Sequence, residues 1–348
     1  GLGAGAVLAW RFRVIDSTKK PATDFASWGW FRSPSQYNRS GPSTLLCVDG
    51  KVPVRANGPL AWLAVSPEPV LGAGCLCIPL CGDDNVVVVS VPTDKYDRAA
   101  ALLKAGGDYK LAPPRSLLSL PAQGRASIQE IEVVVRAVSL LAWHRDNAYS
   151  GLDGKPTTDA RGTAGRRRKT SVGRSLYPRM DAVAIVLVES ADGAFCLLGR
   201  QASFPSGMFT CISGFVEHGE SAEQAAIREV LEETHVSCEP RSVRLVASQP
   251  WPCGRGNHCE LMLGLRARAK RGAESIDCGS GGSDGRGELQ EARWFRREDV
   301  RAMMARSVAG IAGGTGTPPP TGDREHGLFV PPPLAIAHGL IASWALPS

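Results

Sequence analysis

The chain of 348 residues has little of what marks several protein classes. Its 10 cysteines mostly have apolar neighbours, as Cys196 has, and are too sparse for a small disulfide scaffold, which favours a reducing compartment. Apolar runs are short: the one at 86–91 ends at Pro92, far below the ~18 residues that cross a bilayer. We therefore expect a soluble protein. Because residue 1 is Gly, a targeting peptide is neither visible nor excluded.

The composition also excludes a disordered polymer. Hydrophobic residues make up 43% of the chain and charged residues 21%, and the length suits two domains of roughly 150 residues each. The net charge of +6 would help a polyphosphate to approach, but it is too diffuse to identify a nucleic-acid binder.

The first half of the chain carries few clear patterns. Short β-like runs lie at 44–48 and 86–91, and apolar residues at helical spacing predict a helix over 128–143. The polar, basic stretch 145–174 has the composition of a connector. We predict an N-terminal domain at 1–142, a basic connector at 143–175 and a second domain at 176–348.

The second half shows a regular alternation of elements. A capping box formed by Ser221 and Gln224 predicts a helix from about Ala222 to about Thr234. Glutamates spaced i, i+3 and i+4 share one face of that helix and repel one another, so the face requires a cation. Apolar runs predict strands at 182–188, 194–198, 208–214, 242–248, 261–269 and 291–295, loops at 272–287 and 310–327, and a final helix at 334–344.

Residues 214–236 resemble the Nudix box, G-x5-E-x7-R-E-U-x-E-E-x-G-U, where U is aliphatic. One defined position differs: His235 stands where the family has Gly, at a helix exit where a left-handed backbone costs Gly little. We interpret this change as a stability cost that leaves the metal site in place.

The resemblance implies hydrolysis of a diphosphate with Mg²⁺ or Mn²⁺, which carboxylate oxygens hold and which activates water. It assigns Glu229 and Glu233 as principal metal ligands, Glu232 as a further ligand and Glu288 as the residue that completes the metal shell. Arg228 would orient the carboxylates and Glu220 would brace the loop. The alternative is a solvated acidic helix face without function.

A second signature, Ser248-Gln249-Pro250-Trp251-Pro252, is similar to the SQPWP element of the NADH pyrophosphatase branch, including its animal mitochondrial members. Two prolines around an indole form a stiff loop with a flat aromatic surface, suited to a base or nicotinamide ring. The resemblance implies substrate contacts by Tyr177, Gln249, Pro250, Trp251 and Pro252. The alternative is that Trp251 only packs at the edge of the core.

The chain departs from this branch at two places. Bacterial relatives hold a structural zinc with paired Cys-x-x-Cys motifs, but Ser150, Asp153 and Thr170 stand at corresponding positions, so we predict no structural zinc. The segment 253–260 interrupts the substrate loop. Its Cys253, His258 and Cys259 allow a metal site, but an inserted loop or a mis-spliced gene model is the preferred interpretation.

The resemblance therefore predicts a Nudix α/β/α sandwich around a mixed sheet, with a smaller N-terminal α+β domain. The expected activity converts NADH, NADPH or NAD into NMN(H) and AMP, or 2′-phospho-AMP. The alternatives are a hydrolase that acts on ADP-ribose or on NAD-capped RNA, and a homologue that binds nucleotide but is catalytically weak. Homodimerisation and a mitochondrial location, otherwise a cytoplasmic one, are further expectations, with no membrane partner and no nucleic acid other than NAD-capped RNA.

Overall fold

The computed structural model describes residues 42–56, 58–65, 76–80, 86–159, 167–278, 289–312 and 327–346. The described residues form two compact units. The first unit contains 182–249 and the described residues from 261 onward. The second unit contains the described residues up to 181 together with 250–260. Within the described part of the chain, no helix is both long and apolar enough to span a membrane.

The first of these units is built on a six-stranded sheet with the order β12-β13-β9-β10-β14, and β11 pairs with β9. Strands β10 and β11 run antiparallel to β9, and β14 runs antiparallel to β10. The unit consists of β9 (Asp181–Glu189), β10 (Phe195–Arg200), β11 (Ile212–Phe215), α5 (Ala222–Thr234), η5 (Pro240–Ser242), β12 (Arg244–Trp251), β13 (Glu260–Arg268), β14 (Glu291–Arg296), α6 (Arg297–Ala312) and α7 (Ile336–Ala345).

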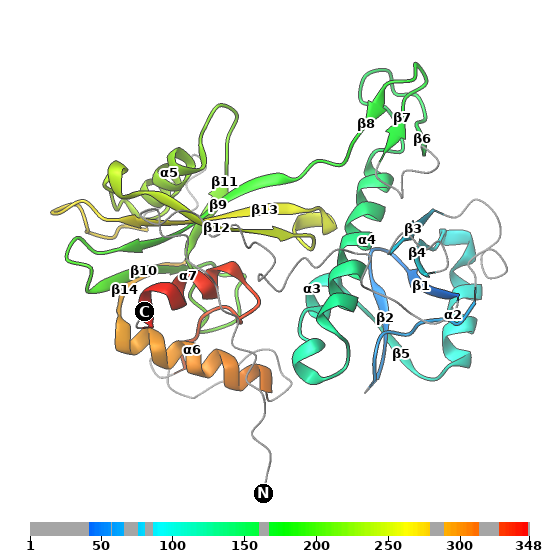
Figure 1. Cartoon of the computed structure of the whole chain (residues 1–348), viewed down its shortest axis with the longest axis horizontal. Coiled ribbons are helices and arrows are strands. Elements are labelled where there is room, and N and C mark those ends of the chain that lie inside the picture. The colour runs from blue at the N-terminus through cyan, green and yellow to red at the C-terminus, as the bar shows by residue number, and fades with distance from the viewer. Residues whose placement is uncertain are drawn as a thin grey trace, which may run out of the picture. The chain divides into compact units, whose positions relative to one another are not determined.

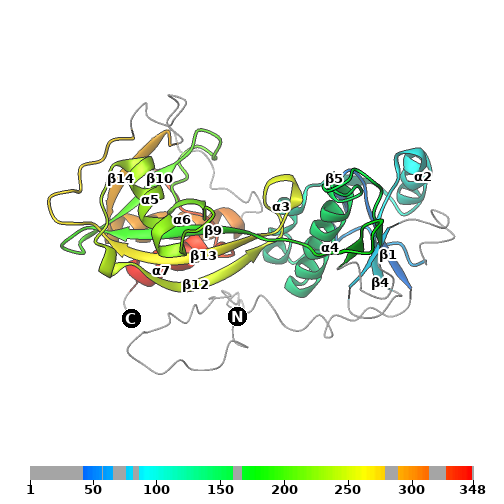
Figure 2. The same ribbon diagram turned by 90° about the horizontal axis from the view of Figure 1, so that it is seen from above.

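Strand β9 shows why this sheet lies between two helical layers. Its side chains alternate between two cores, as a strand period of two requires. Ile185 and Leu187 pack with residues of α6 and α7, whereas Val186 and Val188 pack with residues of α5. Figures 1 and 2 show α5 on one face of the sheet and α6 with α7 on the other. The predicted α/β/α sandwich is confirmed.

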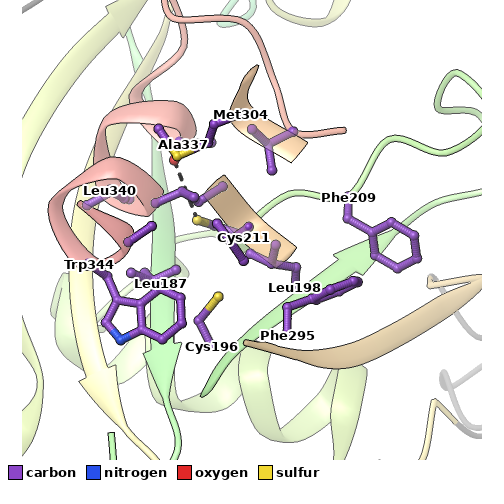
Figure 3. Close-up of a cluster of buried hydrophobic side chains, with 14 of the residues drawn as sticks. Leu187, Cys196, Leu198, Phe209, Cys211, Phe295, Met304, Ala337, Leu340 and Trp344 are labelled. Atoms are coloured by element: carbon purple, nitrogen blue, oxygen red, sulfur yellow. Dashed lines mark hydrogen bonds between the residues drawn. The ribbon is translucent and has the colours of Figure 1, made fainter. Parts of the chain in front are cut away.

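The core on the α6 and α7 side is the larger of these two and is shown in Figure 3. Phe209 and Phe295 meet edge to face with ring centroids 5.1 Å apart, and Trp344 is fully buried. Helix α6 was absent from the sequence prediction, which placed a loop from 310. Its buried Val300, Met303 and Met304 nevertheless have helical spacing.

The described part of the second unit contains three small sheets, with the orders β1-β4-β3, β2-β5 and β6-β7-β8. Strands β1 and β4 are parallel, and Leu46 lies opposite Val89. The elements are β1 (Ser43–Cys47), β2 (Val52–Arg55), β3 (Cys77–Pro79), β4 (Val86–Ser90), η3 (Thr93–Lys95), α2 (Tyr96–Ala105), β5 (Tyr109–Ala112), α3 (Pro114–Leu117), η4 (Pro121–Gln123), α4 (Ile128–Asp146), β6 (Thr158–Asp159), β7 (Arg168–Lys169), β8 (Ser175–Leu176) and η6 (Arg255–Asn257).

The segment predicted as a connector contains the sheet β6-β7-β8 in its described part. Asp153 Oδ2 accepts a hydrogen bond from the Ser171 hydroxyl at 3.0 Å, which joins the turn at 150–155 to the turn at 170–174. The Thr170 hydroxyl accepts the Arg174 amide at 3.0 Å. The oxygen side chains at the positions aligned with cysteines thus take part in turn hydrogen bonds.

Candidate metal and diphosphate site

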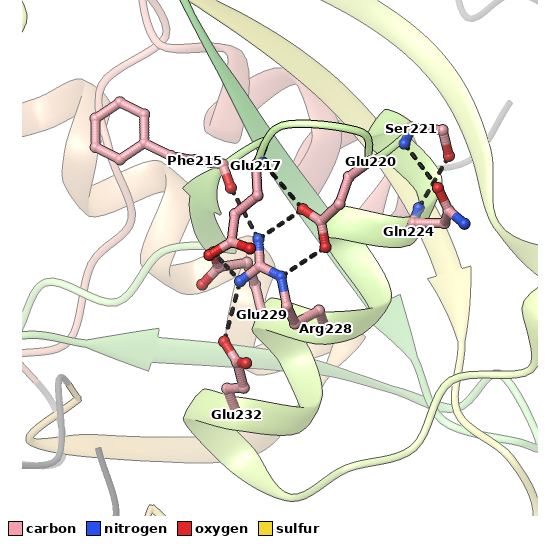
Figure 4. A network of polar contacts seen from close by, with 8 residues as sticks. All are labelled: Phe215, Glu217, Glu220, Ser221, Gln224, Arg228, Glu229 and Glu232. Atoms are coloured by element: carbon pink, nitrogen blue, oxygen red, sulfur yellow. Dashed lines mark hydrogen bonds and ion pairs between the residues drawn. The ribbon is translucent and has the colours of Figure 1, made fainter. Parts of the chain in front are cut away.

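Helix α5 begins where the sequence predicted. Ser221 is the N-cap: its hydroxyl accepts the Gln224 amide N–H at 3.2 Å, and Gln224 Oε1 accepts the Ser221 amide at 2.8 Å. This reciprocal pair, visible in Figure 4, satisfies two backbone donors that a helix start leaves open. The cap thereby sets which side chains of the following turns face the loop before the helix.

Arg228 supplies the cation that the acidic helix face requires. Its Nε and Nη2 atoms donate to the two carboxylate oxygens of Glu220, at 2.7 and 2.9 Å. Its Nη1 atom donates to Glu229 at 2.7 Å and to Glu232 at 3.0 Å, and Nη2 also reaches the Phe215 carbonyl at 2.9 Å. These bonds use all the N–H groups of the guanidinium, which a lysine could not do. Figure 4 shows the resulting network.

The network changes the acidity of its members. Hydrogen bonds from Arg228, followed by one from the Glu217 amide at 3.0 Å, lower the pKa of Glu220 to about 2. The hydrogen bond to Glu220 in turn raises the pKa of Arg228 above its usual range. Glu220 therefore remains charged at every pH at which the protein would be expected to work, and its carboxylate joins the Glu217 amide of the loop before α5 to Arg228 of the helix.

The pKa of Glu220 predicts a contribution to acid unfolding. Because its folded pKa lies below the usual 4.5, the carboxylate stabilises the fold above pH 4.5, and this contribution disappears as the pH falls towards about 2. We expect the unfolding free energy of Glu220→Gln to fall less than that of the wild type between pH 4.5 and 2, as measured by urea titration. Glu239→Gln, an exposed control, should follow the wild type; equal slopes for all three proteins would contradict the assignment.

Gly214, in β11, leaves room for the Glu229 carboxylate. A Cβ atom at Gly214 would overlap that carboxylate, so any larger residue would displace it. The sequence pattern marked this glycine but gave no physical reason for it. Only the pairing of β11 with β9, which brings the strand beside α5, reveals the recess.

His235 adopts the left-handed conformation expected at this position, with φ 59°. Its amide donates to the Leu231 carbonyl at 2.9 Å, which ends the helix as a glycine would. Its ring Nδ1 lies 3.0 Å from the Asp277 carbonyl, a contact that Gly lacks. The family difference therefore leaves the cap geometry of α5 intact.

The donor set of α5 suits a hard divalent cation. Glu229 has a side chain only 12% exposed, Glu233 is buried and Glu232 is exposed. Each carboxylate offers two oxygens with several lone-pair directions, so a bond to Arg228 leaves capacity for Mg²⁺ or Mn²⁺. In the described residues, no group of three His, Cys, Asp or Glu side chains is already gathered for a metal ion. Glu288, the fourth predicted ligand, lies outside the described residues.

The predicted substrate residues fall in both units. Gln249 is buried and lies near the end of strand β12. Its Nε2 atom donates to the Leu334 carbonyl at 2.8 Å, and its Oε1 atom accepts the Ile336 amide at 2.8 Å. Its amide thus ties β12 to the start of α7, a structural role that spacing could not reveal. Tyr177 is 56% exposed, and the segment Pro250–Pro252 follows with Trp251 half-buried and Pro252 buried. Tyr177 and 250–252 belong to the second unit.

The chain is similar to known proteins. Residues 178–311 match the family model of the NUDIX domain. The human NAD-capped RNA hydrolase NUDT12 is 36% identical over 245 residues, or 68% of this chain and 45% of that protein. The NAD-capped RNA hydrolase NudC of Mycobacterium bovis is 38% identical over 62% of this chain and 60% of its own length. For the human mitochondrial NAD(P)H pyrophosphatase NUDT13 the values are 35%, 62% and 55%.

The chain thus spans about half the length of the curated relatives that it matches. Among solved structures, a MutT/nudix family protein from Enterococcus faecalis aligns with 52% of this chain and 56% of its own, at 16% identity and a TM-score of 0.29. The segment 178–311, which matches the NUDIX domain model, includes helix α5, Gly214 and the complete Arg228 network, so the site described above lies within the matched part of the chain.

Proposed function

We propose that the protein hydrolyses the diphosphate linkage of NADH, NADPH or NAD, giving NMN(H) and AMP or 2′-phospho-AMP. The observation that carries this proposal is the acidic face of α5, which Arg228 holds in place through Glu220, Glu229 and Glu232. Relatives named for NAD(P)H and for NAD-capped RNA support a dinucleotide as the substrate.

The carboxylates of Glu229, Glu232 and Glu233 would hold Mg²⁺ or Mn²⁺, and Glu288 would add a ligand. A cation held there would neutralise charge on the phosphate oxygens and activate water. In the overall hydrolysis a water oxygen would bond to one phosphorus while the bond from this phosphorus to the bridging oxygen breaks; the bridging oxygen would leave on the other phosphate, and the protons of the water would be taken up by the products and the solvent. Arg228 and Glu220 keep the carboxylates oriented, and Gly214 leaves the space that Glu229 occupies.

The substrate residues are a further part of the proposal. Trp251, between Pro250 and Pro252, would stack on the base or nicotinamide ring, and Tyr177 offers an exposed aromatic surface of the same kind. Gln249 would act by fixing the end of β12 through its two backbone bonds. A homodimer and a mitochondrial location remain proposals, the latter supported by the name of one relative.

Product analysis across a substrate panel tests this function. With Mg²⁺ or Mn²⁺, NADH should give reduced nicotinamide mononucleotide and AMP, and chelation of the metal should abolish turnover. NADPH, NAD, ADP-ribose and NAD-capped RNA are the other members of the panel, and competition kinetics ranks them. Binding of nucleotide without any product would instead identify a catalytically inactive homologue.

NAD-capped RNA is the second candidate substrate. Two relatives carry this activity in their names, and the cap contains the same diphosphate linkage as NAD. A specificity ratio, kcat/KM for NAD-capped RNA over kcat/KM for NADH, separates the two candidates.

A further inference from the structure

The loop between β12 and β13, residues 252–259, is an ordered turn. Gly256 and Asn257 both have left-handed backbones, with φ 64° and 66°, and the His258 amide donates to the Arg255 carbonyl at 3.1 Å. This is the geometry of a tight turn with two positive φ angles, which Gly and Asn tolerate best. The Gly254 amide donates to the His258 carbonyl at 3.1 Å and closes the turn at its base.

Two side chains of this turn contact the second unit, to which the loop belongs. His258 Nε2 lies 2.7 Å from Asp146 Oδ2, at the last residue of α4. Asn257 Nδ2 donates to the Gly50 carbonyl at 3.1 Å, and a Cβ atom at Gly50 would overlap the Asn257 amide. The loop therefore has one polar contact to a helix end and one close backbone contact.

The position of Asp146 at the C-terminus of α4 favours contacts with positively charged or hydrogen-donating side chains. A carboxylate at a helix C-terminus faces the negative end of the helix dipole, which is unfavourable unless cations surround it. Arg145 donates to both oxygens of Asp146, at 2.6 and 3.2 Å, and His258 contacts the second of these oxygens. A histidine bearing a proton on Nε2 thus joins an existing charge pair.

The metal alternative for this loop has no support from these contacts. Burial raises the pKa of the Cys253 thiol to about 12 and that of the Cys259 thiol to about 11, which disfavours the thiolates that bind metal. The His258 ring is directed to Asp146 instead. The contacts of His258 with Asp146 and of Asn257 with Gly50 therefore suggest a structural role for the loop.

We propose that His258 and Asn257 are positioning residues that hold the loop 252–259 against Asp146 and Gly50. Trp251, which precedes this loop, is thereby presented to the dinucleotide in one orientation. Pro252 and Cys253, between Trp251 and the turn, are buried and transmit the attachment. The Asp181 amide donates to the Cys259 carbonyl at 3.2 Å and fixes the return of the chain. This inference rests on the proposed function for its effect on substrate, but not for the attachment itself.

The contacts of His258 and Asn257 determine the fraction of protein molecules whose loop 252–259 is in the binding-competent conformation. Loss of a contact lowers that fraction and raises the apparent KM or Kd in proportion, while kcat at saturation stays the same because the glutamates of α5 are unchanged. The His258 and Asp146 side chains are 39% and 36% exposed, so each contact should be worth about a threefold change. Loss of both should give about tenfold.

We would measure KM and kcat for NADH in the wild type, in His258→Ala, in Asn257→Gly and in the double variant that combines these two substitutions. Glycine at position 257 retains the left-handed turn. His258→Gln can still donate to Asp146 and should recover most of the lost affinity. Arg296→Ala, which removes an exposed ion pair with Glu298 at 3.8 Å, is the matched control. His258→Ala and Asp146→Ala should be non-additive in a double-mutant cycle.

Hydrogen exchange and NADH affinity separate this inference from the proposed function. Amides of 253–259 should exchange faster in the double variant, and its Kd for NADH without added metal should rise by the same factor as KM. If the wild type binds NADH without turnover, the proposed function fails, but exchange and Kd still decide the attachment. Unchanged exchange, an unchanged Kd, or a fall in kcat at constant KM would overturn it.

Discussion

We expect Glu229→Gln and Glu233→Gln each to lower kcat for NADH hydrolysis by about 10²–10³-fold. The amide keeps the size of the side chain but loses the charge and one of the two oxygens that a hard cation uses. Stability should change little. In Glu229→Gln the amide oxygen can still accept from Arg228, and the two glutamates, spaced i and i+4, repel each other in the wild type.

The measurement is steady-state kinetics at saturating Mg²⁺, together with thermal unfolding of each variant. Glu223→Gln, in the first turn of the same helix, is the control and should retain wild-type turnover. If both site variants turned over NADH as fast as the control, the acidic face of α5 would have no part in the reaction.

The second large effect concerns stability. Arg228→Ala should lower the free energy of unfolding by about 2–4 kcal/mol, because it removes the shared cation from three carboxylates, two of which, those of Glu220 and Glu229, are largely shielded from water. The Arg228 side chain is 22% exposed, and those of Glu220 and Glu229 are 19% and 12% exposed. Arg228→Lys should fall between Ala and wild type, since an ammonium cannot make the two-oxygen bond to Glu220.

Urea unfolding followed by tryptophan fluorescence gives the free energies. Arg296→Ala, at an exposed ion pair, should stay within about 0.5 kcal/mol of the wild type. A loss for Arg228→Ala as small as that of Arg296→Ala would mean that the network orders the helix face without stabilising the fold.

Local signals in the sequence predicted much of this domain. The capping box at Ser221 located α5 because its two bonds join residues three apart. Uninterrupted apolar runs located β9 and β10 because both faces of these strands are buried. Helix α6 was missed because it follows β14 directly, and the charged residues at its start, Arg297 to Asp299, resemble a turn.

The parts of the site that were not predicted depend on contacts between distant segments. The Phe215 carbonyl that receives Arg228 has no side-chain signal, and the Gln249 amide meets backbone groups more than 80 residues away. The strand predicted at 208–214 is confirmed only from Ile212, since residues before it form single bridges, such as Met208 to Phe329. Spacing alone cannot specify such partners.

Strand β9 has a consequence for how this domain can change over evolutionary time. Odd-numbered positions from Ile185 serve one core and even-numbered positions from Val186 serve the other. A deletion of one codon within it would exchange the two sets of side chains between the layers. We therefore infer that natural variation in β9 is confined to substitutions of similar volume, and that changes of length are accommodated in the connecting loops.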